Sequence, residues 1–208
     1  MASFPPNPPA VSPKTPLNFS LIPSMSEIME SSRAQGLRLR LRSLGPFFRV
    51  RAEGEGGAEL GRAEGVIRPW LKGKVLHLDS MRMARETLAM DRSIFGLGLF
   101  LGAVAVRHGF DRGCTRAELL AINDSPLYHS KLVRFYTRMG FKVVHEVDGS
   151  SMGDLAHMLV WGGRGTRMDA SIEELLMKWG KRSILSDKHN WLDTKSLLLK
   201  VIIKPCHL

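Results

Sequence analysis

The longest apolar run, from Ile94 to Val106, most constrains what this chain can fold into. The run is about 13 residues long, whereas crossing a bilayer takes ~20, and three glycines (Gly96, Gly98 and Gly102) interrupt it. A run of this length is better explained as a buried core helix than as a membrane span. We therefore predict a protein with no membrane span and with one helix packed into its interior.

The residues before this run predict strands. Three leucines alternate with three arginines from Leu37 to Arg42, so one face of the segment is apolar. Further strand-like segments are Phe47–Ala52, Glu59–Trp70 and Lys74–Met83, separated by the glycine-rich turn 53–57 and by a second turn at 71–73. Four antiparallel strands in a meander are the simplest interpretation.

Strands and helices alternate after the apolar run. The predicted elements are a strand at Arg116–Ile122, a helix at Ser130–Met139 ended by Gly140, strands at Phe141–Val147 and Ala156–Trp161, and a helix that starts after Ser171 with the capping-box residue Glu174. The order ββββ-α-β-α-β-β-α predicts an α/β (α+β) fold, with a mixed, mostly antiparallel sheet flanked by helices. We assign this domain to residues 37–182.

The two ends of the chain differ in composition from the middle. Residues 1–36 are rich in Pro and Ser, and the first acidic residue is Glu27. This composition predicts an organelle transit peptide, plastid more than mitochondrial; the alternative is a disordered extension without an address, on a cytoplasmic protein. Residues 183–208 form an atypical tail to which we assign no function.

Charge and cysteine content exclude several classes of protein. The net charge is +10, but residues 1–51 alone carry seven basic and two acidic side chains, so the middle of the chain is only weakly basic. This suits an anionic cofactor better than a nucleic-acid backbone, so we do not predict nucleic-acid binding. Cys114 and Cys206 lie far apart, and the seven histidines show no ligand spacing. We predict neither a disulfide framework nor a metal site.

Two glycines open the apolar helix. The segment is Arg92-Ser93-Ile94-Phe95-Gly96-Leu97-Gly98. Glycines two apart at a strand-to-helix junction allow backbone N–H groups to form a nest for phosphate oxygens, and the helix N-terminus adds partial positive charge. The structural alternative is that the glycines only permit close packing of the helix on the sheet.

A second motif follows about forty residues later: Tyr136, separated by three residues from Gly140-Phe141 at the end of the next helix. Together the two motifs resemble the GNAT superfamily of acyl-CoA N-acyltransferases, in a plant organelle-type member, over residues 37–180. The resemblance implies acetyl-CoA as co-substrate and direct attack of a primary amine on its thioester. The amine would belong to a protein lysine or N-terminus, or to a small molecule.

The resemblance also implies roles for individual residues. The loop residues Arg92 to Gly98 would bind the pyrophosphate, and the backbone of Met81, Arg82 and Met83 would hold the acyl carbonyl where the fourth and fifth strands separate. Tyr136 would protonate the leaving thiolate, although it could instead be a core tyrosine. His129 stands where family members commonly have an asparagine, seven residues before the tyrosine, and would belong to the cofactor site.

The general base has three candidates. His77 and Asp79 are two residues apart on one strand and therefore share a face, and Glu118 lies on the next strand. The alternative is that the strand simply has a polar outer face. The acceptor groove would be lined by the early strands, Leu37–Phe48, and by the loop Asp148–Asp154. A catalytically weak or inactive CoA-binding or scaffold protein is the alternative function.

Overall fold

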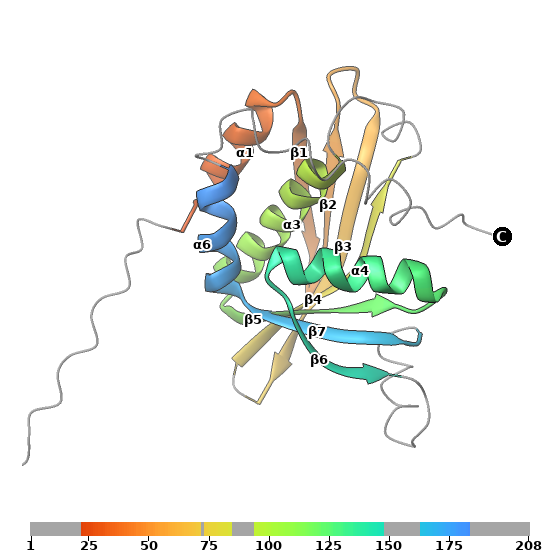
Figure 1. Cartoon of the computed structure of the whole chain (residues 1–208). Helices are drawn as coiled ribbons and strands as arrows, with labels where there is room; N and C mark the ends of the chain where they lie inside the picture. Colours follow the sequence, from red (N-terminus) through yellow and green to blue (C-terminus); the bar gives the residue numbers. More distant parts are fainter. Residues whose placement is uncertain (1–21, 72, 85–93, 148–162, 184–208) are drawn as a thin grey trace, which may run out of the picture.

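The computed structural model describes residues 22–71, 73–84, 94–147 and 163–183 (Figure 1). Seven strands form one sheet in the order β1-β2-β3-β4-β5-β7-β6. The strands are β1 (Arg38–Leu44), β2 (Phe47–Glu53), β3 (Glu59–Trp70), β4 (Gly73–Met83), β5 (Cys114–Ile122), β6 (Lys142–Val147) and β7 (Gly165–Ser171). Adjacent strands are antiparallel except β4 and β5, which are parallel. The predicted fold class, including the four-strand meander, is confirmed.

Helix α3 (Ile94–Asp111) is the buried helix that the apolar run predicts. It packs on β2, β3, β4 and β5, and it also contacts α1 (Met25–Ala34) and α6 (Ile172–Ser183). Leu101, Val104 and Val106 are completely buried. Burying a side chain of this size contributes ~1.5–3 kcal/mol, so this helix anchors the core.

The ends of the remaining predicted helices follow from local chemistry. Helix α4 (Pro126–Met139) starts one turn earlier than predicted, because Pro126 occupies the first turn, where its missing N–H costs nothing. Gly140 ends the helix with φ 119°, a left-handed conformation that favours glycine. At the start of α6, the N–H of Glu174 donates to the Ser171 hydroxyl at 3.4 Å, as the capping box predicts.

Helix α1 was not predicted. It lies inside the segment 1–36 that composition assigned to an extension, and Ser24 and Glu27 cap it reciprocally. Ile28 is only 1% exposed and belongs to the core. The ordered domain therefore includes residues before Leu37. Of the segment 1–36, predicted as a transit peptide or disordered extension, residues 1–21 lie outside the described residues.

The last strand of the sheet also differs from the prediction. β7 comprises Gly165–Ser171 and pairs with both β5 and β6. The strand predicted at Ala156–Trp161 lies outside the described residues, as does the tail after residue 183. Among the described helices, none has the length and apolar character needed to cross a membrane.

Candidate functional site

The sheet opens between β4 and β5. Their parallel pairing runs from Lys74 opposite Cys114 to Leu78 opposite Leu119. Both strands continue beyond these positions, β4 to Met83 and β5 to Ile122, but the pairing between them ends. The backbone groups that face each other across this gap are therefore not used by the sheet, and a bound molecule can take their place.

A β-bulge produces the gap. Gly65 of β3 lies opposite Leu78 and Glu64 lies opposite Ser80, so Asp79 is an extra residue on β4. A bulge bends its strand and increases the local twist, which turns β4 away from β5 at this point. Gly65 is required here, because a Cβ at that position would lie 2.2 Å from the His77 carbonyl oxygen.

Two backbone N–H groups of β4 point into the gap. The N–H of Ala84 donates to the carbonyl of Leu60 at 2.9 Å, which directs the peptide groups of this residue toward β3. Successive residues of a strand present their peptide groups to opposite sides. Met81 and Met83 therefore direct their N–H groups toward the gap, whereas Arg82 faces β3. The predicted acyl-holding segment lies at the open edge of the sheet.

The beginning of α3 packs against the same part of β4. A Cβ on Gly98 would lie 3.4 Å from Met83, 3.6 Å from Met81 and 3.9 Å from Phe135 of α4. These are ordinary van der Waals distances, so α3 packs against β4 and α4 here without requiring a glycine at position 98. Leu97 is buried in the core, and Gly96 is half-buried. Ile94 and Phe95 form the first residues of the helix, and Arg92 and Ser93 lie outside the described residues.

Tyr136 lies on α4 in an aromatic cluster. Its ring makes edge contacts with Phe135 at 5.2 Å and with Phe141 at 5.9 Å between centroids. Burial raises the pKa of Tyr136 to about 12. The phenol therefore keeps its proton at neutral pH, which an acid requires.

His129 lies on the same helix, α4, seven residues before Tyr136. Its Nε2 forms a hydrogen bond of 2.8 Å with the hydroxyl of Thr166, a buried residue of β7. This contact ties α4 to β7. The sequence assigned His129 to the cofactor site, and its observed hydrogen bond is to a side chain of the sheet.

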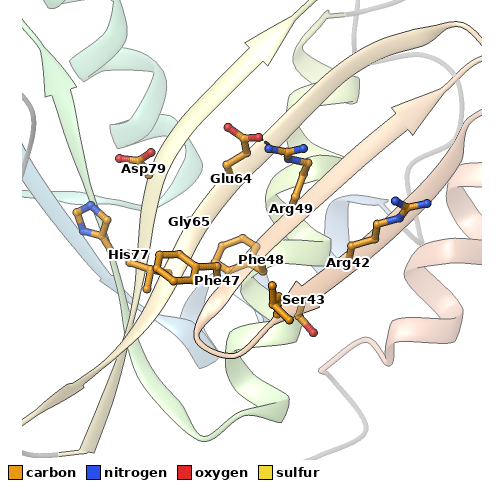
Figure 2. Close-up of a pocket in the computed structure, with 11 residues that line it drawn as sticks. Arg42, Ser43, Phe47, Phe48, Arg49, Glu64, Gly65, His77 and Asp79 are labelled. Atoms are coloured by element: carbon orange, nitrogen blue, oxygen red, sulfur yellow. Dashed lines mark ion pairs between the residues drawn. The ribbon is translucent and has the colours of Figure 1, made fainter.

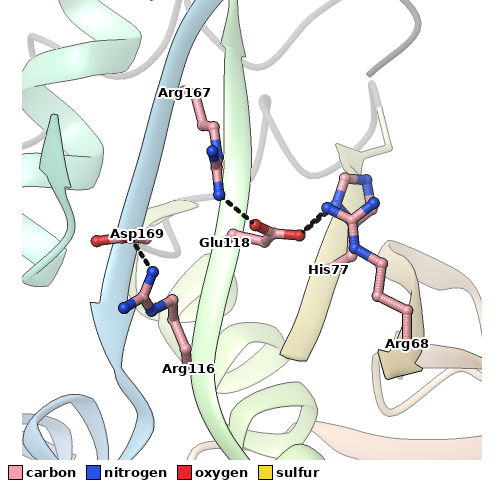
Figure 3. A network of polar contacts seen from close by, with 6 residues as sticks. All are labelled: Arg68, His77, Arg116, Glu118, Arg167 and Asp169. Atoms are coloured by element: carbon pink, nitrogen blue, oxygen red, sulfur yellow. Dashed lines mark hydrogen bonds and ion pairs between the residues drawn. The ribbon is translucent and has the colours of Figure 1, made fainter. Parts of the chain in front are cut away.

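Glu118 is the centre of a buried polar cluster on the sheet face opposite α3 (Figure 3). It is 2% exposed, and its carboxylate contacts Arg68, Arg167 at 3.1 Å and His77 Nδ1 at 3.4 Å. Burial acts to raise the pKa of Glu118, but the His77 hydrogen bond and the two guanidinium charges outweigh it and lower that pKa. The carboxylate is therefore ionised and can only accept hydrogen bonds.

The ionised carboxylate of Glu118 determines which ring nitrogen of His77 carries the hydrogen. Because the Glu118 carboxylate accepts, His77 Nδ1 carries the hydrogen, and a neutral ring then has its lone pair on Nε2. A carboxylate held between two arginines is a poor proton acceptor. Glu118 thus serves better as the partner that positions His77 than as the base itself.

His77 and Asp79 line one groove of about 770 Å³ (Figure 2). His77 is 5% exposed, whereas Asp79, the bulged residue, is exposed. The groove runs over β1 to β4 and includes residues of the early strands, where the sequence located the acceptor; the loop Asp148–Asp154 lies outside the described residues. Its other lining residues are Arg42, Ser43, Leu44, Phe47, Phe48, Arg49, Glu64, Gly65 and Val66.

His77, Asp79 and the unpaired edge of β4 lie together at the bulge, whereas the described contacts of Tyr136 are with Phe135 and Phe141. The groove reaches the bulge on the sheet face opposite α3, and the gap opens at the same bulge. Sequence reasoning did not identify Arg68 or Arg167, because only the folded sheet places them beside Glu118. It also missed the bulge, for which Gly65 is the only sequence signal. Within the described ranges, no cluster of three His, Cys, Asp or Glu side chains could hold a metal ion.

Comparison with known proteins gives structural similarity only. No family model and no curated protein matches the chain. Mutant forms of spermidine/spermine N-acetyltransferase SpeG from Vibrio cholerae align with a TM-score of 0.46 and 14% identity, covering 64% of this chain and 72% of that one. Nourseothricin acetyltransferase aligns with a TM-score of 0.42 and 18% identity, over 66% and 85%. A putative acetyl transferase from Pyrococcus furiosus gives 0.41 and 19%, over 52% and 68%. Each is a partial similarity of backbone path at low identity.

Proposed function

We propose that this protein is an N-acetyltransferase of the GNAT type, which moves an acetyl group from acetyl-CoA to a primary amine. One observation carries the proposal: parallel strands β4 and β5 separate beyond a bulge, with the Met81 and Met83 N–H groups facing the gap. This chain's own residues fit an acyl thioester, since the gap offers extended backbone donors, and Tyr136 of α4 would supply a neutral acid.

Acetyl-CoA would supply an acetyl group activated as a thioester. In the transfer, the carbon–sulfur bond breaks and a carbon–nitrogen bond forms. The Met81 and Met83 N–H groups would stabilise the negative charge that develops on the carbonyl oxygen. Tyr136 would give its proton to the sulfur, and His77 or Asp79 would take the proton that the amine loses. Direct attack needs no covalent bond to the protein.

Glu118 supports the base in this scheme. The carboxylate, itself fixed by Arg68 and Arg167, keeps the hydrogen of His77 on Nδ1. In this tautomer, Nε2 would be the ring nitrogen that accepts the amine proton. Asp79 is exposed beside it and attracts the ammonium form of the acceptor into the groove.

The first test is the melting temperature of the protein with and without acetyl-CoA. Ligand at a hundred times its dissociation constant stabilises the folded state by about 2.7 kcal/mol. For a chain of this size, that raises the melting temperature by roughly 5–11 °C. Absence of a shift in folded protein would refute the proposal.

The second test separates binding from chemistry. Tyr136→Phe should keep the acetyl-CoA shift and lower turnover on an amine panel by about 100-fold, because only the acid is removed. Tyr128→Phe is the matched control, since Tyr128 is an exposed tyrosine on the same helix. A shift with no turnover on any amine would favour the CoA-binding or scaffold alternative.

A further inference from the structure

Four arginines form a row across the face of the sheet that carries the groove. The register of the strands places Arg40 opposite Arg51, Arg51 opposite Arg62, and Arg62 opposite Arg82. Directly paired residues point to the same face, and Val50 and Ala52 on either side of Arg51 are buried. The row therefore lies on the face opposite the core and crosses about 14 Å, three strand spacings of ~4.8 Å.

This row continues into the groove. The next row, two residues along each strand, contains Arg42, Arg49 and Glu64, which line the groove. The following row is apolar on β1 to β3, with Leu44, Phe47 and Val66, and reaches His77 on β4. The face thus combines a charged half and an apolar half that meet at the bulge.

Positive charge exceeds negative charge on the charged half. Ion pairs join Arg40 to Glu53 at 3.0 Å, Arg51 to Glu59 at 3.4 Å and Arg49 to Glu64 at 2.5 Å. Arg62 also pairs with Glu59 at 3.7 Å and with Glu64 at 3.9 Å, so these three glutamates serve four arginines. Three more arginines, Arg38, Arg42 and Arg82, add positive charge to the same face. An anionic partner would complete the pairing.

The groove has a negative side chain at the bulge and a positive one at its other end. Asp79 and Arg42 lie at opposite ends of the groove (Figure 2), and among the described residues neither makes an ion pair. Phe47, 64% exposed, offers an apolar surface between them. A molecule that fits this groove has a cationic amine at one end, a partly apolar body, and negative charge beyond it.

We propose that the acceptor is an acidic polypeptide segment that carries a primary amine. The amine meets Asp79 and His77, and the carboxylates that follow along the segment meet arginines of this face. Guanidinium groups bind carboxylates with paired hydrogen bonds, which makes an arginine cluster selective for acidic segments. This proposal rests on the acetyltransferase function proposed above.

Two features favour a polypeptide over a nucleic acid. Glu59 and Glu64 lie among the arginines and interrupt the positive charge that a phosphate backbone would follow. Asp79 would repel a phosphate at the end of the groove but attracts an ammonium. A polyamine is also disfavoured, because its distal positive charges would face Arg42 and Arg49.

The proposal is tested by binding and by kinetics on the full chain. A ten-residue peptide with a free N-terminus, four Asp or Glu residues after the first position and a C-terminal fluorophore is compared with its Asn/Gln counterpart by fluorescence anisotropy. We expect the acidic peptide to bind at least tenfold more tightly at low salt, with a preference that falls as salt rises. A single-stranded RNA of twelve nucleotides serves as the competing polyanion. Equal binding of the two peptides, or tighter binding of the RNA, would overturn the proposal.

The double variant Arg42→Gln/Arg51→Gln should weaken acidic-peptide binding about five- to tenfold, because each exposed ion pair contributes a small factor. Its KM for the acidic peptide should rise, while the acetyl-CoA melting shift stays the same. Arg33→Gln/Lys142→Gln removes two exposed positive charges elsewhere and is the matched control. Equal losses in the two variants would show that only net charge matters and would overturn the assignment of this face.

Two further arms complete the design. A lysine-free peptide with a free N-terminus, compared with an N-terminally blocked peptide that has one lysine, identifies which amine is acetylated. An acetyl-CoA shift without selective binding of the acidic peptide would overturn the acceptor class and leave the acetyltransferase function standing. Peptide binding without an acetyl-CoA shift would refute the acetyltransferase function, and with it the role of the peptide as acceptor.

Discussion

The buried carboxylate of Glu118 allows a quantitative test of the site. Glu118→Gln keeps the size of the side chain but removes the charge that balances Arg68 and Arg167, whose side chains are 28% and 13% exposed. Removing one partner of a buried ion pair costs about 3–5 kcal/mol, because a buried charge is left uncompensated. Both arginines retain some contact with water and the glutamine oxygen still accepts one hydrogen bond. We therefore expect a cost at or just below the bottom of this range, about 2–3 kcal/mol, or a fall of roughly 4–12 °C in melting temperature.

The stabilisation that Glu118 provides should depend on pH in a defined direction. The folded-state pKa of Glu118 is lower than the usual 4.5, so the ionised carboxylate stabilises the folded state. That stabilisation is fully present above the unfolded-state pKa and is lost as the pH falls through the folded-state pKa. The difference in unfolding free energy between wild type and Glu118→Gln should stay constant from pH 6 to 8 and shrink below about pH 4.5.

Urea denaturation at several pH values measures this difference. Asp169→Asn is the matched control, because Asp169 is paired with the half-exposed Arg116 at 3.1 Å on the same face of the sheet. An ion pair of this kind contributes below about 1 kcal/mol. If Glu118→Gln costs no more than Asp169→Asn at pH 7, the cluster does not hold a buried charge and the proposed positioning of His77 fails.

Three further predictions concern the bulge, the acid and the first helix. Gly65→Ala should lower the unfolding free energy by more than about 2 kcal/mol, because its Cβ would overlap the neighbouring strand, whereas Gly56→Ala, with open space around it, should change it by less than about 0.5 kcal/mol in urea titrations. In a Tyr128→Phe background, absorbance at 295 nm should report Tyr136 ionising only near its pKa of about 12, and ionisation near pH 10 would contradict its burial. Ile28→Ala should cost about 2–4 kcal/mol by calorimetry, since this residue is 1% exposed; a loss below about 1 kcal/mol would mean that α1 does not contribute to the core.

The sequence was sufficient to predict those strands and helices whose residue patterns are local. The alternation from Leu37 to Arg42 has the period of two that is typical of a strand, and the apolar run from Ile94 is typical of a buried helix. Both patterns depend only on neighbouring residues. Helix α1 had a comparable signal in Ser24 and Glu27, the reciprocal cap. The prolines and the acid-poor composition before it favoured an extension instead, although composition does not exclude a short helix packed on the domain.

The structural features that the sequence did not predict depend on residues far apart in the chain. β7 has small or moderately apolar side chains on its buried face, Thr166, Met168 and Ala170, and takes part in the core because β5 and β6 lie beside it. The arginine row is invisible in the sequence, since its members come from four strands and only the register aligns them. The same holds for Glu118, whose partners are separated from it by about fifty residues in either direction.

The bulge at Asp79 links the two halves of the proposed site. One extra residue on β4 ends the pairing with β5 and so exposes the Met81 and Met83 N–H groups on one side. The same residue places a carboxylate at the end of the groove, next to His77. Because acceptor and acyl donor must approach from opposite sides and meet at one carbon, a site of this kind needs an opening through the sheet. A single insertion supplies that opening and a charge to attract the amine, so the geometry of the gap and the chemistry of the groove have a common origin.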